Sequence, residues 1–318
     1  MLMLDADTVL NKLPFTTLVD ELAVMHLKPI GLIDEILTAT EDDQENTNHF
    51  FIRTGWQPEE ALGAKVTTIF PRNNQENRHP SIHAIYALFE GQYGRPIACL
   101  DGTALTYIKT AADSALGSQL LARPNPGSML MIGAGEMALH VITAHCQIHP
   151  SIKQVYIWNR TAEKAKALSA GELAKRFPQI NFQAVNSIED YARKVDLISS
   201  AIATTTPLLK GDWLKPGVHV DLIGAYLPEM READDTCMSR ASIFVDARET
   251  TVAQIGELMI PLANGSIAEN DIKADLSELC QQRHGGRQSP DEITLFKNGG
   301  GGHLDLMVAR ILYRHHQL

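Results

Sequence analysis

The chain has 318 residues, which is long enough for two domains that each bury a core. Its net charge of −10 and pI of about 5.6 argue against a nucleic-acid or anionic-membrane surface, because both need a basic patch. No apolar run approaches the roughly 20 residues of a membrane span, and the N-terminus lacks the pattern of a signal peptide. We therefore expect a cytoplasmic protein with a small-molecule partner, and reduced thiols at the widely spaced Cys99, Cys146, Cys237 and Cys280.

The first third of the chain predicts helices followed by an antiparallel sheet. Apolar residues at helical spacing over residues 5–40 indicate helices broken near Pro29, and the acidic stretch 40–48 indicates a loop. Short β-rich segments separated by turns come next, at residues 50–54, 64–70, 82–89 and 96–100. A helix over residues 103–121 then ends at the proline-rich stretch 123–127, which we interpret as a domain boundary.

From Ser128 onward the pattern alternates between strand and helix. Strands are expected at residues 128–132, 154–158, 181–184, 195–201, 217–223, 242–246 and 292–296, and helices at residues 136–147, 162–177, 188–193, 252–258 and from 303 to the end. Such alternation predicts an α/β fold with a doubly wound parallel sheet of the Rossmann type, whose ligands bind at the carboxyl ends of its strands.

A glycine turn follows the first of these strands. Gly133 allows a sharp turn, Gly135 lets backbone N–H groups approach a pyrophosphate, and the small Ala138 fills the third position of the pattern. An ordinary strand-turn-helix has the same appearance. The second strand, with its polar tip, makes a dinucleotide site the better interpretation, and we assign cofactor contacts to Gly133, Ala134, Gly135, Glu136 and Met137.

The tip of the second strand indicates which dinucleotide binds. An acidic residue there would hold the ribose 2′-hydroxyl of NAD, whereas this chain has Asn159, Arg160 and Thr161, with Lys164 close behind. A guanidinium suits a 2′-phosphate, so NADPH is favoured over NADH. The alternative is that Thr161 caps the following helix while Arg160 is solvated.

Several charged or polar residues have two interpretations. Lys65 lies mid-strand among apolar residues, where a lysine is often a solvated edge-strand charge. Arg53 is placed similarly, and Lys109 by pattern alone is a surface charge. His145 and His149 are interpreted as surface histidines and not as metal ligands, because no third ligand is evident. The glycines 299–302 indicate either a mobile backbone or a close approach to a ligand.

Taken together, the motifs resemble the ornithine cyclodeaminase/μ-crystallin family in order over nearly the whole chain. The resemblance is carried by Gly63–Lys65, Phe70-Pro71, Ser81, Leu105–Ala112, Ile132–Gly135, Trp158–Thr161, Gly224–Glu232 and Glu292–Lys297. It implies a homodimer with an α+β substrate-binding and dimerisation domain (residues 1–122 and 303–318) beside a Rossmann domain (123–302). Members of this family include cyclodeaminases, alanine dehydrogenases and reductases of cyclic imines.

The resemblance also implies roles for individual residues. Lys65 matches the active-site lysine, which contacts substrate and is a candidate proton donor, and Ser81 matches a hydroxyl residue that contacts substrate. Lys109 stands where the family usually has an arginine for the substrate carboxylate. A second family arginine is missing, and we infer that Arg53 takes its place. Further cofactor contacts are expected at Thr110, Ala201, Ala203, Thr204, Gly224 and Lys297.

One departure from the family decides between reactions. Cyclodeaminases have a catalytic aspartate just after the Gly224-Ala225 equivalent, and this chain has Tyr226. Deamination and cyclisation lose an acid/base group without that carboxylate, whereas reduction of a preformed imine needs only hydride and a proton. Tyr226 is expected to line the pocket or orient a water, although an aromatic at such a site is often only packing.

The hypothesis from sequence is therefore an NADPH-dependent reductase of Δ1-pyrroline-2-carboxylate or Δ1-piperideine-2-carboxylate, which makes L-proline or L-pipecolate. An amino-acid dehydrogenase or residual cyclodeaminase is the alternative within enzymes. A non-catalytic binder of NADPH or a small ligand, as the μ-crystallin resemblance allows, is the alternative of another class.

Overall fold

The computed structural model describes residues 1–41, 47–73 and 79–317, and it divides into two compact units. Unit 1 comprises Met1–Lys109 and Gly301–Leu318, and unit 2 comprises Thr110–Gly300. The divisions thus fall after residues 109 and 300, where the sequence suggested 122 and 302. None of the helices in the described ranges combines the length and apolar character needed to cross a bilayer.

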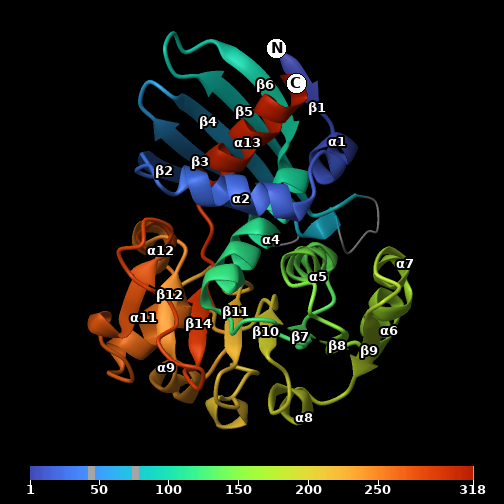
Figure 1. The fold of residues 1–318 in the computed structure, drawn as a ribbon. Helices are drawn as coiled ribbons and strands as arrows, with labels where there is room; N and C mark the ends of the chain where they lie inside the picture. The colour runs from blue at the N-terminus through green and yellow to red at the C-terminus, as the bar shows by residue number, and fades with distance from the viewer. Residues whose placement is uncertain (42–46, 74–78, 318) are drawn as a thin grey trace. The chain divides into compact units, whose positions relative to one another are not determined.

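Unit 1 is a mixed sheet with helices on one face. Its strands are β1 (Leu2–Leu4), β2 (Leu32–Glu41), β3 (Thr47–Gln57), β4 (Ala61–Ile69), β5 (Ile82–Glu90) and β6 (Pro96–Asp101), in the order β1-β6-β5-β4-β3-β2. Its helices are α1 (Ala6–Asn11), α2 (Phe15–Met25), the start of α4 (Gly102–Leu121) and α13 (Gly302–Gln317). Helix α13 packs on β3 and β4 and against α2, as Figure 1 shows in red and blue.

Two expectations for the first third were wrong. Residues 32–41 form strand β2 and no helix, because they pair antiparallel with β3 and include the β-branched Thr38 and Thr40. The helical spacing of Ile33, Ile36 and Leu37 was coincidental. The N-terminal strand β1 was missed, and it runs parallel to β6, so the sheet is not wholly antiparallel. The expected loop at 40–48 lies mostly outside the described residues.

Strand β4 fixes which side chains face the helices. Its residues alternate between buried and half-buried along Ala61–Ile69, with the odd-numbered ones up to Thr67 buried. Register places Lys65 beside Arg53 of β3 and Tyr86 of β5, and Arg53 beside Glu35 of β2. A row of polar and charged side chains therefore crosses the sheet on its helix-covered face.

Unit 2 is an α/β unit with a wholly parallel sheet. Its strands are β7 (Ser128–Ile132), β8 (Gln154–Trp158), β9 (Asn181–Val185), β10 (Leu197–Ser200), β11 (His219–Leu222), β12 (Ser242–Val245), β13 (Ile272–Asp275) and β14 (Thr294–Lys297). Its helices are the rest of α4, then α5 (Glu136–Ile148), α6 (Ala162–Ala170), α7 (Glu172–Arg176), α8 (Ile188–Ala192), α9 (Asp235–Arg240), α10 (Arg248–Thr251), α11 (Gly256–Ala263) and α12 (Leu276–Cys280), with short 3₁₀ turns at Gly211–Trp213 and Glu269–Asp271.

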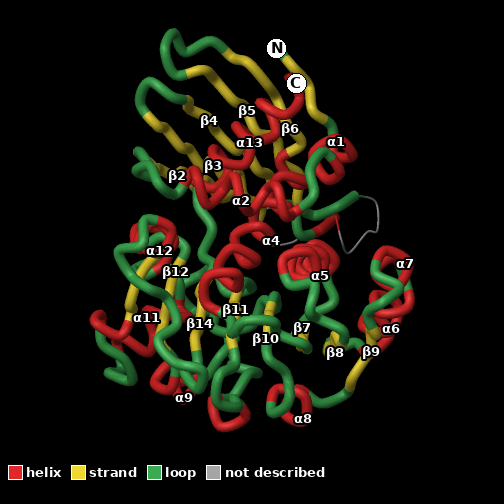
Figure 2. Tube along the Cα trace, in the orientation of Figure 1, coloured by secondary structure: helices red, strands yellow, loops and turns green. Residues whose placement is uncertain are grey.

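The strand order β13-β12-β14-β11-β10-β7-β8-β9 confirms the predicted doubly wound sheet. The chain runs outward from β7 to β9 and then returns to β10 on the other side of β7, as the alternation of yellow strands and red helices in Figure 2 lets the reader follow. The switch point of the topology therefore lies between β7 and β10. In open α/β sheets, ligands bind at the carboxyl ends of the strands at such a point.

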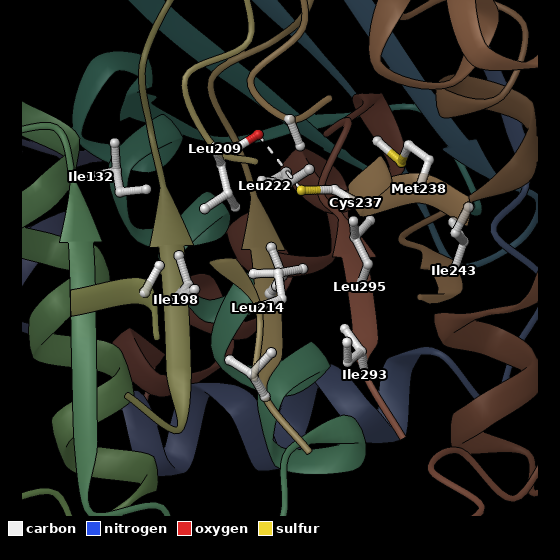
Figure 3. Close-up of a cluster of buried hydrophobic side chains, with 14 of the residues drawn as sticks. Ile132, Ile198, Leu209, Leu214, Leu222, Cys237, Met238, Ile243, Ile293 and Leu295 are labelled. Atoms are coloured by element: carbon white, nitrogen blue, oxygen red, sulfur yellow. Dashed lines mark hydrogen bonds between the residues drawn. The ribbon is translucent and has the colours of Figure 1, made fainter. Parts of the chain in front are cut away.

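An apolar core lies on one face of this sheet. Ile132, Ile198, Leu222 and Leu295 come from four adjacent strands, and Figure 3 shows them with Cys237, whose thiol lies 3.6 Å from the carbonyl oxygen of Leu209. Burial raises the pKa of Cys237 well above its usual value and that of Cys146 to about 12, so both remain thiols. The cysteines form no disulfide within the described chain.

Several expected elements of unit 2 differ in extent. The helix expected over residues 162–177 is interrupted at Gly171, and the one expected over 252–258 is two short helices on either side of Ile255. Helices α9 and α12 and strand β13 were not predicted. These are short elements whose apolar pattern is too brief to establish a period.

The histidines His145 and His149 were wrongly placed at the surface. His145 is fully buried and His149 nearly so, and Ser118 Oγ lies 3.1 Å from His145 Nδ1 and 2.9 Å from His149 Nε2. Burial lowers the pKa of His149 to about 4, with His145 adding to the fall. The polar face that these two histidines give α5 is therefore packed inside unit 2, where Ser118 of α4 contacts one ring nitrogen of each.

The four glycines 299–302 are held by close packing. A side chain at Gly299 would meet Thr251 Oγ1 at 2.3 Å, and one at Gly302 would meet the Thr54 carbonyl oxygen at 2.1 Å. Gly300 has a φ of 69°, which favours glycine. The N–H groups of Gly299 and Gly300 donate to Asp246 Oδ2 at 3.0 and 2.6 Å. The sequence left open mobility or a ligand, and the structure shows contacts with the protein itself.

Candidate functional site

The glycine turn after β7 has the geometry that dinucleotide binding requires. Gly133 has a φ of 110°, and a side chain there would approach the Ala201 carbonyl oxygen at 2.9 Å. Its N–H donates to Trp158 at 2.8 Å. Gly135 then occupies the N-cap position of α5 in an extended conformation with no side-chain cap. The turn is thus fixed by its neighbours, and the amides at the start of α5 have no protein side chain capping them.

Asn159 joins the glycine turn to the tip of β8. Its Oδ1 accepts from the Ala134 N–H at 3.1 Å, and its Nδ2 donates to the Thr161 carbonyl at 2.9 Å. An amide can do both, whereas an aspartate there would lack the donor. Asn159 is therefore a structural clamp for the turn, whatever it contacts in a ligand.

Gly135 and two cations that follow β8 are open to solvent. A Cβ built on Gly135 has nothing within 4 Å, so no protein contact explains a glycine there. Arg160 and Lys164 are exposed, and neither side chain has a hydrogen bond or ion pair with another described residue. Thr161 precedes α6 without a side-chain cap bond, so the capping of the alternative interpretation is not made. These features leave an open backbone beside two available cations.

The loops after β10 and β11 are held by a buried carboxylate, Glu232. Its Oε1 accepts from Ser200 Oγ at 2.6 Å and from the Ile202 N–H at 3.1 Å. Its Oε2 accepts from the N–H groups of Gly224 and Ala225 at 2.5 and 3.2 Å. Both loops contain residues expected at the cofactor, so one side chain fixes their backbones together.

Two further buried charged residues, Glu257 and Lys297, lie around Glu232 and its loops. Glu257 accepts the N–H groups of Glu232 and Ala233 at 2.6 and 3.0 Å, and burial raises its pKa to about 7. Lys297 donates to the carbonyls of Leu222 and Asn298 at 3.0 and 2.8 Å and is fully buried. Its positive charge opposes the rise that burial causes in the pKa of Glu232. Lys297 is thus surrounded by protein groups.

In unit 1, two of the three cations expected at the substrate share one carboxylate, Asp305. Lys65 Nζ lies 3.0 Å from Asp305 Oδ2, and Lys109 Nζ lies 3.1 Å from Asp305 Oδ1. Both lysines are buried, so their interpretation as solvated surface charges was wrong. β4 lies between β3 and β5 and is no edge strand. Buried ammonium groups need a counter-charge, which Asp305 of α13 provides.

Arg53 is the more open cation of this cluster. Its side chain is 23% exposed, its Nε donates to Glu35 Oε2 at 3.1 Å, and its guanidinium lies over the Phe51 ring at 4.8 Å. The hydrogen bonds among described residues use only Nε, which leaves the two terminal NH₂ groups for a ligand. Lys109, by contrast, is directed at Asp305 and at the Gly301 carbonyl, 3.3 Å away.

The charges of Lys65, Lys109, Arg53 and Asp305 shift the pKa values of Lys65 and Asp305. Burial lowers the pKa of Lys65 to about 7, with Lys109 and Arg53 adding to the fall and Asp305 opposing it. Burial alone would raise the pKa of Asp305, but Lys109 and Lys65 hold it below its usual value. Lys65 is therefore poised to gain and lose a proton near neutral pH, as a general acid requires.

Two further buried groups lie near the cluster and lack partners within the described residues. The Tyr86 hydroxyl lies over Gly63, and burial, with a contribution from Asp305, raises its pKa. His303 is fully buried with neither ring nitrogen hydrogen-bonded, and burial holds its pKa well below the usual value. Unsatisfied buried donors of this kind are uncommon and are consistent with a ligand site.

The remaining expected residues are more scattered. Ser81 precedes β5, and its buried hydroxyl has no partner in the described chain. Thr110 is buried in α4, where its carbonyl accepts from Asn298. Tyr226 is 57% exposed. Of the others not yet placed, Glu136 and Met137 are the first two residues of α5, and Ala201, Ala203 and Thr204 lie in the loop after β10. Their roles stay predictions.

The sequence missed Asp305, Glu257 and Asp246, and it gave no role to Glu232. A carboxylate inside the otherwise apolar stretch 304–309 was a signal for Asp305, because a buried acid needs a cation. Within the described residues, no three or more His, Cys, Asp or Glu side chains are arranged to hold a metal ion.

Comparison with known proteins agrees with this geometry. A family profile described as the Ornithine cyclodeaminase/mu-crystallin family matches residues 53–317. The chain belongs to this family. It is 41% identical over 268 residues to a Delta(1)-pyrroline-2-carboxylate reductase of Paracoccus denitrificans, which is 84% of each protein. It is 34% identical to the protein of that name from Colwellia psychrerythraea, over 97% of both.

A solved structure extends the similarity to the fold. The Delta(1)-pyrroline-2-carboxylate reductase of Thermococcus litoralis, in complex with NADH and L-proline, superposes with a TM-score of 0.89 at 26% identity. The match covers 100% of this chain and 98% of that one. An archaeal alanine dehydrogenase with bound NAD has the same fold, with a TM-score of 0.87 at 23% identity.

Gly135 provides a test of the dinucleotide site. Replacing it with valine puts a side chain where no protein atom lies, so the free energy of unfolding should fall by only about 1 kcal/mol, because valine is a poorer N-cap residue than glycine. The same side chain should block a pyrophosphate and raise the Kd for a nicotinamide dinucleotide, NADH or NADPH, roughly tenfold or more, a loss of about 1.4 kcal/mol or more. Fluorescence titration and urea unfolding measure the two quantities.

The matched control is Gly285→Val, because Gly285 also has room for a Cβ but lies in a different loop. It should leave the affinity for the dinucleotide unchanged. Unchanged affinity in Gly135→Val would place the dinucleotide elsewhere.

Proposed function

We propose that this protein is an NADPH-dependent ketimine reductase that converts Δ1-pyrroline-2-carboxylate, or its six-membered homologue Δ1-piperideine-2-carboxylate, to L-proline or L-pipecolate. The observation that carries the proposal is the 41% identity, over 84% of both chains, to the Paracoccus reductase. The buried lysine with a pKa of about 7 supports it, because imine reduction requires a proton donor. A cytoplasmic role in proline metabolism would follow.

The residues of the chain divide the reaction between them. When bound, the reduced nicotinamide supplies a hydride for the C=N carbon. In unit 2, the amides at the start of α5 would hold the pyrophosphate, and Glu232 keeps the two neighbouring loops in place. In unit 1, Arg53 would hold the substrate carboxylate through its terminal NH₂ groups, and Lys65 would protonate the imine nitrogen.

The alternatives are less well supported. A cyclodeaminase needs a carboxylate after Gly224-Ala225, and Tyr226 there is exposed and offers only a phenol. A pure binding protein would have no use for a buried lysine whose pKa is lowered to about 7 by burial.

Steady-state rates test the reaction. The protein should oxidise NADPH with Δ1-pyrroline-2-carboxylate or Δ1-piperideine-2-carboxylate, and Lys65→Met should lower kcat roughly 100-fold or more because the proton donor is lost. NADPH affinity should be unchanged in the variant. If neither imine is reduced by protein that binds NADPH normally, the proposal fails. Release of ammonia from ornithine would favour the cyclodeaminase instead.

The preference for NADPH is a finer proposal, supported by the neutral Asn159 and the exposed Arg160 and Lys164. The Thermococcus enzyme was solved with NADH, so the choice rests on these side chains. Arg160→Gln should weaken NADPH binding roughly tenfold, the equivalent of one charge-assisted hydrogen bond, and leave NADH binding unchanged. Lys166→Gln is a suitable control, because Lys166 pairs with Glu163. Equal losses for both cofactors in Arg160→Gln would refute a 2′-phosphate contact.

We also propose that the protein is a homodimer formed through the outer face of the unit 1 sheet. Register places Ile36, Ile52, Val66 and Ile85 in one row on the face opposite Lys65. Leu32, Trp56, Leu62 and Phe89 form another and line a cavity of 540 Å³. Ile36 is 60% and Ile85 is 53% exposed. A contiguous exposed apolar face of this kind is typical of a subunit interface.

Light scattering tests the dimer. Ile36→Glu places a charge within the apolar face and should convert the dimer to monomers, because an unpaired charge would be desolvated in the interface. Tyr93→Glu is the control, since Tyr93 is 73% exposed in the turn before β6. A monomeric unchanged protein, or a dimeric Ile36→Glu variant, would contradict the proposal.

A further inference from the structure

Asp305 is the shared counter-ion of two buried lysines. It is itself fully buried on α13, and its oxygens lie 3.0 and 3.1 Å from Lys65 Nζ and 3.1 Å from Lys109 Nζ. The neighbouring Arg53 is paired with Glu35. Without Asp305, two ammonium groups would be buried next to each other with no negative charge between them.

The hydrogen bonds of Lys65 also orient its ammonium group. An ammonium has three N–H donors. One is directed at Asp305 and a second at Thr106 Oγ1, 3.2 Å away. Thr106 is itself committed as a donor to the Gly102 carbonyl at 2.8 Å, so it presents a lone pair to Lys65. Two of the three donors are thus fixed by protein, and the direction of the third is fixed with them.

We propose that Asp305 is a positioning residue that keeps Lys65 in its ammonium form and directs the third N–H of Lys65 at the imine nitrogen. The proposal rests on the proposed function. Hydride adds to the imine carbon while an N–H bond of Lys65 breaks and a new N–H bond forms on the substrate nitrogen. Lys65 is left neutral and regains its proton from water, and Asp305 stays ionised throughout.

The sign of the expected effect follows from the groups that surround Lys65. They are Arg53 of β3 with Glu35 of β2 beyond it, Tyr86 of β5, Thr106 and Lys109 of α4, and His303 and Asp305 of α13. Lys109 and Arg53 lower the pKa of Lys65, and Asp305 raises it. Loss of the carboxylate must therefore lower that pKa, and loss of Lys109 must raise it.

The test is the pH profile of kcat with Δ1-pyrroline-2-carboxylate and NADPH. Lys65 donates its proton only below its pKa, so the rate should fall as the pH rises through that value. In Asp305→Asn the alkaline limb should move to lower pH by about one unit or more, because the opposite charge is removed. In Lys109→Met it should move to higher pH. A limb that stays in place in Asp305→Asn, with only the amplitude reduced, would overturn the proposal.

Thr106→Val is the matched control, because it removes a neutral partner of the same ammonium and should move the limb much less. If Asp305→Asn does not fold, Lys109→Met decides, and a limb that is unmoved or shifted to lower pH refutes the proposal. The Lys65 titration can also be followed without turnover, by NMR of ¹³C-lysine protein assigned with Lys65→Met. That measurement separates a failure of this role from a failure of the proposed reaction, since it needs no substrate.

Discussion

The structure of unit 1 depends on one buried electrostatic arrangement, in which Asp305 stands between Lys65 and Lys109. An ammonium group inside a protein is stable only when a counter-charge and hydrogen-bond acceptors replace water. Asp305 meets this requirement, and it belongs to α13, the last helix of the chain, which packs on the sheet formed by the N-terminal strands. The three cations differ in their surroundings. Two are neutralised in the interior, whereas Arg53 lies nearer the solvent and has terminal N–H groups that no described residue uses.

Unit 2 contains buried carboxylates, where unit 1 contains buried ammonium groups, and these too are stabilised by hydrogen bonds and an opposite charge. Glu232, Glu257 and Asp246 are buried acids that accept mostly backbone N–H groups, and they hold the loops at the carboxyl ends of the strands. Lys297 offsets part of their charge. The loops that would contact a dinucleotide are therefore fixed by side chains that need not touch it. Such preorganisation is what precise placement of a cofactor requires.

Local patterns predicted the fold better than the site. The parallel sheet followed from the alternation of strand and helix, because each element carries its own period. Strand β2 was misread because a few apolar residues fit both periods. The burial of Lys65 was implied by family resemblance and not by its own strand, since a mid-strand lysine without known neighbours looks like a surface charge. His145 and His149 were misplaced for the same reason. Their partner Ser118 lies on another helix, and no spacing in the sequence reveals it.

The partnership of Lys65 with Asp305 spans 240 residues of sequence. Unit 1 is therefore discontinuous along the chain, and its sheet is synthesised long before the helix that covers it. Until α13 emerges, the charged row on β3, β4 and β5 has no carboxylate from that helix and its apolar neighbours have no cover. Contacts of such long range close late and slowly, because the loop entropy must be overcome first. The order of synthesis thus favours a unit 2 that folds first and a unit 1 that is completed last.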